Sequence, residues 1–270
     1  MKYRTIGEVR VSPDGQWAVF VVSVPNFDEN VMNSDLWLLE LATSLPAAGR
    51  RYFQLTRWGK RDSSPRWSPD GKRIAFLSDR TDKVNIWVIP ADGGEAEQIT
   101  KVKTGVNDFA WLPDSSGFIF TMTDPVTPEE EKRKQEKNDP ILVDKDIKYA
   151  RLYHCRFGDK EPALLTKDDY HVNSFDISPD GHWVAFGVQP TPKVPDFRKS
   201  DLKLLKLAPM ESGQASGEIR DLVVRPGQDS APRFSPDGNW IAFVSSDGAD
   251  DWIGNTYVCA VRPDGSGLRN

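Results

Sequence analysis

A four-residue turn, Ser-Pro-Asp-Gly, recurs along the chain and constrains the fold more than any other feature. It occurs at residues 12–15, 68–71, 178–181 and 235–238, and residues 112–115 carry a degenerate Leu-Pro-Asp-Ser copy. Proline at the second position and glycine at the fourth suit a tight type I turn, because proline presets φ and glycine accepts a positive φ. The chain therefore contains an internal repeat whose loops vary in length.

Two apolar runs follow each turn in a fixed order. The first runs are residues 17–20, 74–76, 118–120, 183–186 and 240–243, and the second are residues 36–39, 86–89, 152–155, 202–205 and 256–259. In the most regular copy, residues 64–100, a short apolar stretch precedes the turn and a weaker one covers residues 97–100. This pattern predicts four short strands joined by turns, which is one antiparallel meander.

The repeat favours a β-propeller. A single four-stranded sheet cannot bury both of its faces, whereas stacking copies face to face around an axis does so. The second apolar runs are apolar at nearly every position, as expected for strands that are covered on both faces. We predict an all-β protein of about five four-stranded blades, with units at about residues 1–56, 57–100, 101–166, 167–223 and 224–270. The last strand of the fifth unit is expected just after Gly267.

The third unit holds a charged insertion at about residues 125–149. Thr127 suits a helix N-cap, Pro128 the first helical position, and Glu130 completes a capping box, so we predict a helix near residues 128–137. Because it is charged on all sides, it is either a solvated surface helix or a contact for a partner domain. No other helix is expected, and the proline-rich loop 189–198 is predicted to be stiff and without a strand.

Composition excludes several classes of protein. The net charge of −5 is spread along the chain, so nothing suggests binding to nucleic acid or to an anionic membrane. No apolar run approaches the ~20 residues that span a bilayer, and the N-terminus has no signal-peptide core. Cys155 and Cys259 occupy the same repeat position two units apart, too far to bridge. We expect two buried thiols and a cytoplasmic protein.

Catalytic motifs are missing, and we assign no catalytic, cofactor-binding or metal-binding residue and no cofactor. No serine lies in Gly-x-Ser-x-Gly, the elbow of serine hydrolases. His154, His171 and His182 fall on or beside predicted strands and turns, so we interpret them as structural. The acidic clusters 129–131 and 250–251 are expected to be solvated, although either could meet a substrate amine. The tryptophans follow the repeat period, which favours core packing over a ligand platform.

The repeat, with the sequence [WF]-S-P-D-G-x-x-[IV]-A-F followed by an apolar strand, Asp-Gly-Gly and Leu/Ile-Thr, resembles the propeller repeat of the prolyl oligopeptidase family. The acylaminoacyl-peptidase and dipeptidyl-peptidase branch is the most similar, and the insertion, residues 127–153, resembles a segment that these peptidases carry in an early blade. The resemblance covers the whole chain. The repeat is also similar to that of the propeller of the periplasmic Tol system.

The resemblance implies a two-domain serine peptidase in which a propeller, usually of seven blades, caps a C-terminal α/β-hydrolase domain and restricts access to short peptides. The hydrolase half and about two blades are absent from this sequence, so we expect a fragment of a seven-bladed propeller that is inactive alone. Its implied partners are that hydrolase domain and short peptide substrates. The alternative is a free-standing propeller that serves as a protein-binding scaffold, like the Tol-system protein.

Overall fold

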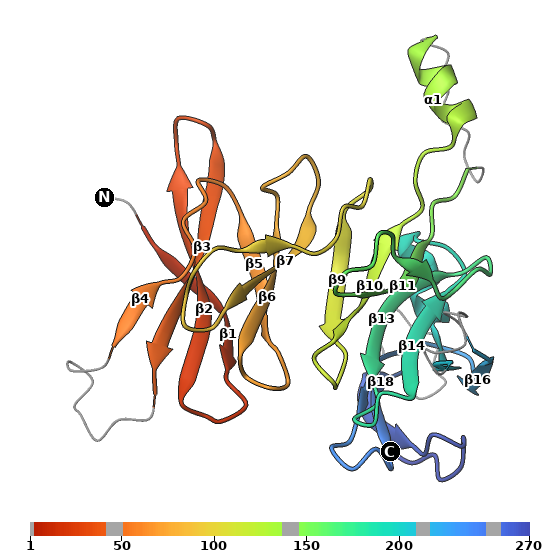
Figure 1. The fold of residues 1–270 in the computed structure, drawn as a ribbon. Coiled ribbons are helices and arrows are strands. Elements are labelled where there is room, and N and C mark those ends of the chain that lie inside the picture. The colour runs from red at the N-terminus through yellow and green to blue at the C-terminus, as the bar shows by residue number, and fades with distance from the viewer. Residues whose placement is uncertain (1–2, 42–50, 137–145, 209–216, 247–254) are drawn as a thin grey trace. The chain divides into compact units, whose positions relative to one another are not determined.

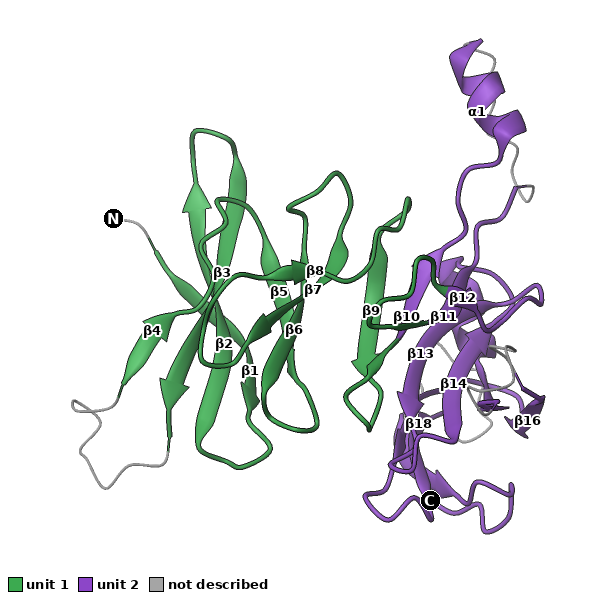
Figure 2. Ribbon diagram, in the orientation of Figure 1, with its two compact units in different colours: residues 1–118, 155–162 green, residues 119–154, 163–270 purple. Residues whose placement is uncertain are grey.

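A computed structural model describes residues 3–41, 51–136, 146–208, 217–246 and 255–270. The chain forms two compact units, shown in Figure 2. Unit 1 contains residues 1–118 and 155–162, and unit 2 contains residues 119–154 and 163–270. Each unit is built of antiparallel sheets, which confirms the predicted all-β class (Figure 1).

Five sheets follow one another along the chain, and in each the strands lie in sequence order. The strands of the first sheet are β1 (Thr5–Val11), β2 (Trp17–Asn26), β3 (Val31–Glu40) and β4 (Tyr52–Gln54). Those of the second are β5 (Asp62–Trp67), β6 (Arg73–Ser78), β7 (Asn85–Pro90) and β8 (Glu97–Gln98). Those of the third, which has strands in both units, are β9 (Val106–Trp111), β10 (Gly117–Thr123), β11 (Ala150–Arg156) and β12 (Ala163–Leu164).

Unit 2 also holds the fourth and fifth sheets. The strands of the fourth are β13 (His171–Ile177), β14 (Trp183–Gln189), β15 (Asp201–Lys206) and β16 (Ile219–Val223). Those of the fifth are β17 (Asp229–Phe234), β18 (Ile241–Ser245) and β19 (Tyr257–Val261). Beyond Gly267, Arg269 and Ala260 exchange two backbone hydrogen bonds of 2.8 and 2.9 Å. This bridge begins a fourth strand where the sequence predicted one.

The repeated turns have the predicted geometry. The glycines at their fourth positions have φ between +71° and +73°, and each donates its N–H to the carbonyl of the first residue, as Gly71 does to Ser68 at 2.9 Å. The aspartate of each turn also accepts a hydrogen bond from the serine hydroxyl, 2.5 Å between Ser68 and Asp70. In the degenerate copy Ser115 adopts φ +59° in place of glycine. The turn therefore fixes how the first strand of a sheet meets the second.

Cores lie between consecutive sheets. In unit 1, side chains on one face of the first sheet pack against the facing side of the second: Val19, Val21, Leu36, Leu38, Ile74, Phe76 and Ile89. In unit 2, the fourth and fifth sheets make the equivalent core with Ala185, Leu202, Leu204, Ile241, Phe243 and Val261. Face-to-face packing of successive sheets is the arrangement of propeller blades.

The insertion forms helix α1 (Pro128–Gln135), capped by Thr127 and Glu130 as a capping box. The helix buries no residue, and Lys148 and Asp146 on the returning chain pair with Glu130 at 2.6 Å and Arg133 at 3.0 Å. These contacts confirm the predicted helix start. The predicted stop at residues 138–140 lies outside the described residues.

The expectation of no other helix is wrong, because the proline-rich loop contains a 3-10 helix, η2 (Val194–Lys199). Pro195 stands in its first turn, where its missing N–H costs nothing. Asp196 accepts hydrogen bonds from Thr191 at 2.5 Å and Lys199 at 3.0 Å, which close the turn. The loop contains no strand, as predicted. No helix in the described part of the chain is long and apolar enough to cross a membrane.

Candidate functional site: the links and inner strands

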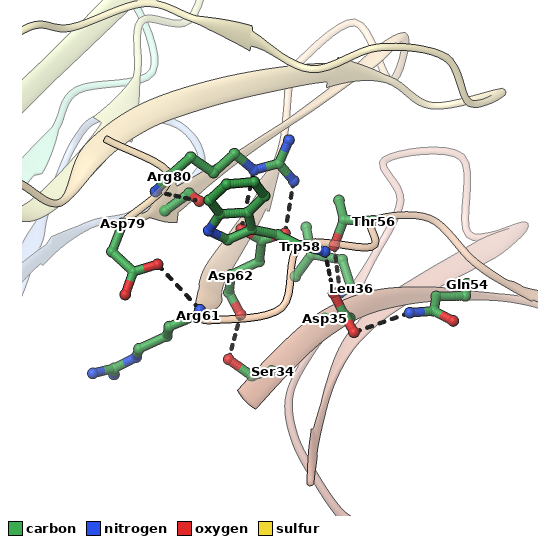
Figure 3. Close-up of polar contacts among 11 residues, drawn as sticks. Ser34, Asp35, Leu36, Gln54, Thr56, Trp58, Arg61, Asp62, Asp79 and Arg80 are labelled. Carbon is green, nitrogen blue, oxygen red and sulfur yellow. Dashed lines mark hydrogen bonds and ion pairs between the residues drawn. The ribbon is translucent and has the colours of Figure 1, made fainter. Parts of the chain in front are cut away.

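The link between the first and second sheets contains a buried ion pair (Figure 3). Asp62, the first residue of β5, is completely buried, and its carboxylate accepts a hydrogen bond of 2.8 Å from Arg80 just after β6. The guanidinium of Arg80 lies 5.3 to 5.8 Å from the ring centres of Trp58, Phe76 and Trp87. Aromatic faces and a carboxylate therefore replace the water that a buried guanidinium loses.

A second carboxylate orders the chain on the other side of this link. Asp35, on β3, accepts hydrogen bonds from the backbone N–H of Trp58 at 3.0 Å and from Gln54 at 2.9 Å. Burial, and then the charge of Asp62, raise the pKa of Asp35 although these hydrogen bonds lower it. The neighbouring Ser34 hydroxyl donates to the carbonyl of Asp62 at 2.9 Å. The link is thus held by side chains together with a single parallel bridge between Ser34 and Arg61.

A threonine completes the link and recurs. Thr56 Oγ1 accepts the backbone N–H of Leu36 at 2.9 Å, and Thr100 and Thr166 do the same for Ile86 at 2.9 Å and Leu152 at 3.0 Å. All three threonines are buried. Each hydroxyl satisfies a backbone donor that the short outer strand leaves unpaired, which explains why the repeat ends in Leu/Ile-Thr.

The first strand of each sheet, its inner strand, carries a row of polar residues. The residue three positions before the turn proline is Arg10, Arg66, Asp176 or Arg233 in four of the sheets. In unit 1, Arg66 pairs with Asp108 of the next inner strand at 2.6 Å. In unit 2, Arg233 lies 3.8 Å from Asp176 and donates to the carbonyl of Phe175 at 2.9 Å. Neighbouring inner strands are therefore joined by side chains.

The inner strands also share an irregularity. Glu8, Ser64 and Ala231, each five residues before the turn proline, have φ between +52° and +53° where the ladder to the second strand shifts register. The N–H of Ser64 is donated to the carboxylate of Glu8, and that of Ala231 to the hydroxyl of Ser174 at 3.0 Å. Positive φ in residues other than glycine costs about 1–3 kcal/mol and gathers at functional sites. The polar row and these bulges, which both lie on the inner strands, form the candidate binding surface.

Sequence reasoning did not find these residues. The bulge position changes its residue type, and the arginine three residues before the turn proline is replaced by Ala110 and Asp176 in two units. Counting back from each turn proline is the signal that locates the inner-strand residues.

The histidines hold three structural positions. His154 is buried in β11, and His171 Nδ1 accepts the backbone N–H of Ala150 at 3.0 Å. His182 pairs with Asp180 at 3.1 Å on an exposed turn. The Ser178 hydroxyl also donates a hydrogen bond to Asp180. Because the carboxylate lies between this hydroxyl and the imidazole of His182, the histidine cannot accept the serine proton.

Other residues singled out in the sequence are also placed. Within the acidic cluster 129–131, Glu129 and Glu131 are exposed, and residues 250–251 lie outside the described residues. Cys155 and Cys259 are both buried and unpaired, as predicted. Burial raises the pKa of the Cys155 thiol to about 11. Among the described residues no cluster of His, Cys, Asp or Glu could hold a metal ion. The arrangement of the described residues can bind and position other groups.

The chain is similar in sequence to several known proteins. No family model matches the chain. It is 28% identical to the uncharacterized peptidase YuxL of Bacillus subtilis over 207 residues, which are 69% of this chain and 30% of that protein. It is 24% identical to dipeptidyl-peptidase 5 of Porphyromonas endodontalis over 264 residues, 89% of this chain and 37% of that protein. The chain therefore spans about a third of the length of these curated relatives.

Solved structures share the fold. Acylaminoacyl peptidase from Pyrococcus horikoshii matches 99% of this chain and 39% of its own with a TM-score of 0.69 and 16% identity. A putative TolB from Agrobacterium tumefaciens matches 98% of this chain and 80% of its own with a TM-score of 0.61 and 18% identity. At these identities the structures establish the fold alone.

The stacked four-stranded sheets define the class as part of a β-propeller. Its relatives by sequence are named as peptidases, so the chain is similar to a propeller domain of peptidases.

Proposed function

We propose that this chain is the substrate-gating propeller of a serine peptidase that cleaves short peptides, of the acylaminoacyl- or dipeptidyl-peptidase kind. The observation that carries the proposal is the pair of relatives named as peptidases, which match most of this chain with only 30% and 37% of their own length. The partner would be an α/β-hydrolase domain of the same polypeptide. Cytoplasmic location is part of the proposal and is supported by the two unpaired cysteines.

The geometry supports a gate because side-chain contacts tie the first sheet to the second and polar residues line the inner strands. The buried pair of Asp62 and Arg80 holds the start of β5 in place. The row that contains Arg66 and Asp108 offers charged groups to a passing peptide without a group that could cut it. A gate of this kind selects by size and charge, and the chemistry belongs to the partner domain.

A free-standing scaffold is the second candidate, because the fold match covers 80% of a putative TolB chain. In that case the inner strands would bind a protein and no hydrolase domain would be needed.

Two reagents separate these candidates. A fluorophosphonate probe labels an activated serine, so we expect no labelling of the 270-residue chain and labelling at one serine in the product of the complete reading frame. A complete product that is not labelled would support the scaffold.

Gating is tested with a short chromogenic peptide, free or fused to a folded protein. Equal cleavage rates for the two would exclude a gate.

A further inference from the structure

A cavity of about 290 Å³ lies between the first and second sheets of unit 1, at the end where the repeated turns stand. Three half-buried aromatic rings line it, those of Trp17, Phe53 and Trp67, and each also packs on the core between the two sheets. Trp17 and Phe53 meet edge to face with 6.2 Å between ring centres, and Trp67 Nε1 donates to the carbonyl of Arg10 at 3.1 Å. The volume is close to the ~300 Å³ at the lower end of small-molecule sites, so the cavity suits one small group.

Charged groups line the same cavity. Asp14 and Asp92 contribute two exposed carboxylates. Asp14 accepts hydrogen bonds from the Ser12 hydroxyl at 2.5 Å and from a backbone N–H at 3.0 Å, and these bonds, the serine's first, lower its pKa. The guanidinium of the exposed Arg51 lies 5.7 Å from the ring centre of Trp17, so that ring already attracts a cation. Negative groups therefore outnumber positive ones in the lining.

The equivalent space between the second and third sheets, also within unit 1, holds an arginine side chain. Arg73, two residues after the turn glycine, has the repeat position of Trp17. Its guanidinium lies 5.4 Å from the ring centre of Trp111 and 4.4 Å from that of Phe157. It also donates a hydrogen bond to the carbonyl of Ser115 at 2.8 Å. A guanidinium is thus bound there by aromatic rings and a backbone carbonyl.

Unit 2 fills the same kind of space with a different arginine. Arg220, on β16, lies 5.9 Å from the ring centre of Trp183, which has the repeat position of Trp17. It donates a hydrogen bond to the carbonyl of Pro263, just after β19 in the next sheet. In both filled spaces an arginine of one sheet therefore contacts aromatic rings and donates to a carbonyl of the sheet that follows.

The residues that accept these hydrogen bonds have counterparts at the cavity. Gly71 is the fourth residue of its turn, as Ser115 is of the degenerate copy. The pairing of the second strand with the third places Ala91 at the repeat position of Pro263. Gly71 and Ala91 both line the cavity. The first two sheets therefore keep both acceptor positions of the filled spaces.

The arginines themselves are replaced in the first sheet. Trp17 stands at the repeat position of Arg73, and the strand pairing places Phe53 at that of Arg220. Aromatic rings are therefore present at both positions from which the second and fourth sheets supply a guanidinium. The cavity lies where these sheets have their arginine side chain.

We propose that this cavity binds an external guanidinium group, either an arginine side chain of a peptide or a free small molecule. The three rings attract the planar cation, Gly71 and Ala91 offer carbonyl acceptors, and Asp14 and Asp92 balance the charge. A guanidinium is preferred to an ammonium because its flat face stacks on rings while its edge donates hydrogen bonds. This inference goes beyond the proposed gate, since it concerns the turn end of two sheets and needs no hydrolase domain.

Calorimetric titration of the 270-residue chain with L-argininamide tests the proposal, and L-citrullinamide is the neutral probe of the same shape. We expect argininamide to bind at millimolar concentrations and citrullinamide to bind at least about tenfold more weakly, because it lacks the charge. A capped Gly-Arg-Gly peptide distinguishes the two sources. Tighter binding of the peptide than of argininamide assigns the site to a peptide side chain, and weaker binding assigns it to a free small molecule.

Variants locate the binding site. Asp14→Asn and Asp92→Asn should each weaken the binding of argininamide about threefold or more, because each removes a carboxylate from the lining. Asp237→Asn makes the same change in a turn of unit 2 and should leave the affinity unchanged. Trp17→Arg supplies a guanidinium as Arg73 does, so it should abolish binding. Urea unfolding shows whether each variant is folded.

Equal binding of argininamide and citrullinamide, or no binding of any of the three probes, would overturn the proposal. Binding that persists in a folded Trp17→Arg would also overturn it, because the ligand would then lie elsewhere. Arg51→Ala should strengthen the binding of argininamide about threefold, since Arg51 repels the ligand and competes for the Trp17 ring. Binding of acetate or inorganic phosphate that Arg51→Ala abolishes would instead identify an anion site and reject the proposal.

Discussion

Two buried aspartates, one in each unit, occupy the same repeat position and obtain their counter-ions differently. Asp62 and Asp229 both lie seven residues before the turn proline, and they are 0% and 1% exposed. Asp62 is paired with Arg80, which follows the second strand of the same sheet. Asp229 is paired at 3.0 Å with Arg225, which comes from the link that precedes it. The two carboxylates hold the same repeat position, and a different loop supplies the cation in each case.

The surroundings of the two arginines differ as well. Arg80 lies among three aromatic rings, whereas Arg225 lies 5.8 Å from the ring of Phe243 and donates to the hydroxyl of Ser245. In both environments the carboxylate is buried away from water. In these two sheets the inner strand therefore begins with a buried charge that must be neutralised, and the partner of that charge varies. The other three sheets have apolar residues at this position, Ile6, Val106 and Val172.

Removal of either arginine is the largest effect we predict. Arg80→Ala leaves Asp62 buried without a counter-ion, and we expect a loss of about 3–5 kcal/mol in the free energy of unfolding. Arg225→Ala should cost a similar amount, with the damage confined to unit 2. Urea unfolding gives the magnitude, and hydrogen exchange shows which unit opens.

Arg57→Ala is the matched control, because Arg57 is exposed on the same link and should change stability by less than about 0.5 kcal/mol. A loss below about 1 kcal/mol for both Arg80→Ala and Arg225→Ala would show that neither pair matters to stability.

The turn proline and the apolar runs predicted the sheets and their order, because tight turns and strand patterns are local properties of the chain. The ion pairs were not predicted, because Arg80 and Arg225 stand at different repeat positions and meet their aspartates only in the folded sheet. The bulges were missed for a related reason. Glu8, Ser64 and Ala231 share a position and a φ near +53°, yet they have no residue type in common.

Thr56→Val tests the threonine of the first link and should have the next largest effect. The substitution keeps the shape and removes the acceptor for the buried N–H of Leu36, so we expect a loss of about 1–3 kcal/mol. Thr100→Val removes the same contact in the second sheet and should cost as much. Thr81→Val, on an exposed turn, is the control. If the unfolding curves of all three variants coincide, the threonine hydroxyl does not stabilise the repeat.

A histidine makes the link before the fourth sheet sensitive to acid. His171 accepts the N–H of Ala150, so it must be neutral in that contact, and burial lowers its pKa from the usual 6.5. The stability from this neutral histidine is present above pH 6.5 and is lost as the pH falls through the lowered pKa. The effect should stay below about 1 kcal/mol because the ring is partly exposed to solvent. Unfolding of the wild type and of His171→Asn at pH 7.5 and pH 5.5 measures it, and a parallel loss in both would assign the acid sensitivity elsewhere.

The smallest effect concerns Asp35, and the second sheet supplies its natural control. At the same repeat position that sheet has Asn85, whose side-chain oxygen accepts the N–H of Val102 at 2.9 Å, as Asp35 accepts that of Trp58. Asp35→Asn therefore keeps the link, provided that the Gln54 amide turns to accept from the new amide. Burial is the main reason why the pKa of Asp35 is raised. The folded protein therefore favours the protonated carboxyl, and the ionised carboxylate lowers the stability of the fold near neutral pH.

We expect Asp35→Asn to leave the protein equally stable or more stable by up to about 0.5 kcal/mol at pH 7, a small effect because solvent screens the site. The wild type should regain that difference as the pH falls through the raised pKa toward the ordinary 3.8, where Asp35 becomes protonated in the folded protein. Urea midpoints at pH 7 and pH 4 measure both. Asp201 in unit 2 bonds the N–H of Arg225 and has a pKa raised mainly by burial, so Asp201→Asn should shift stability in the same direction. A loss of more than about 1 kcal/mol at pH 7 in either variant would show that the charge itself, rather than the acceptor oxygen, holds the link.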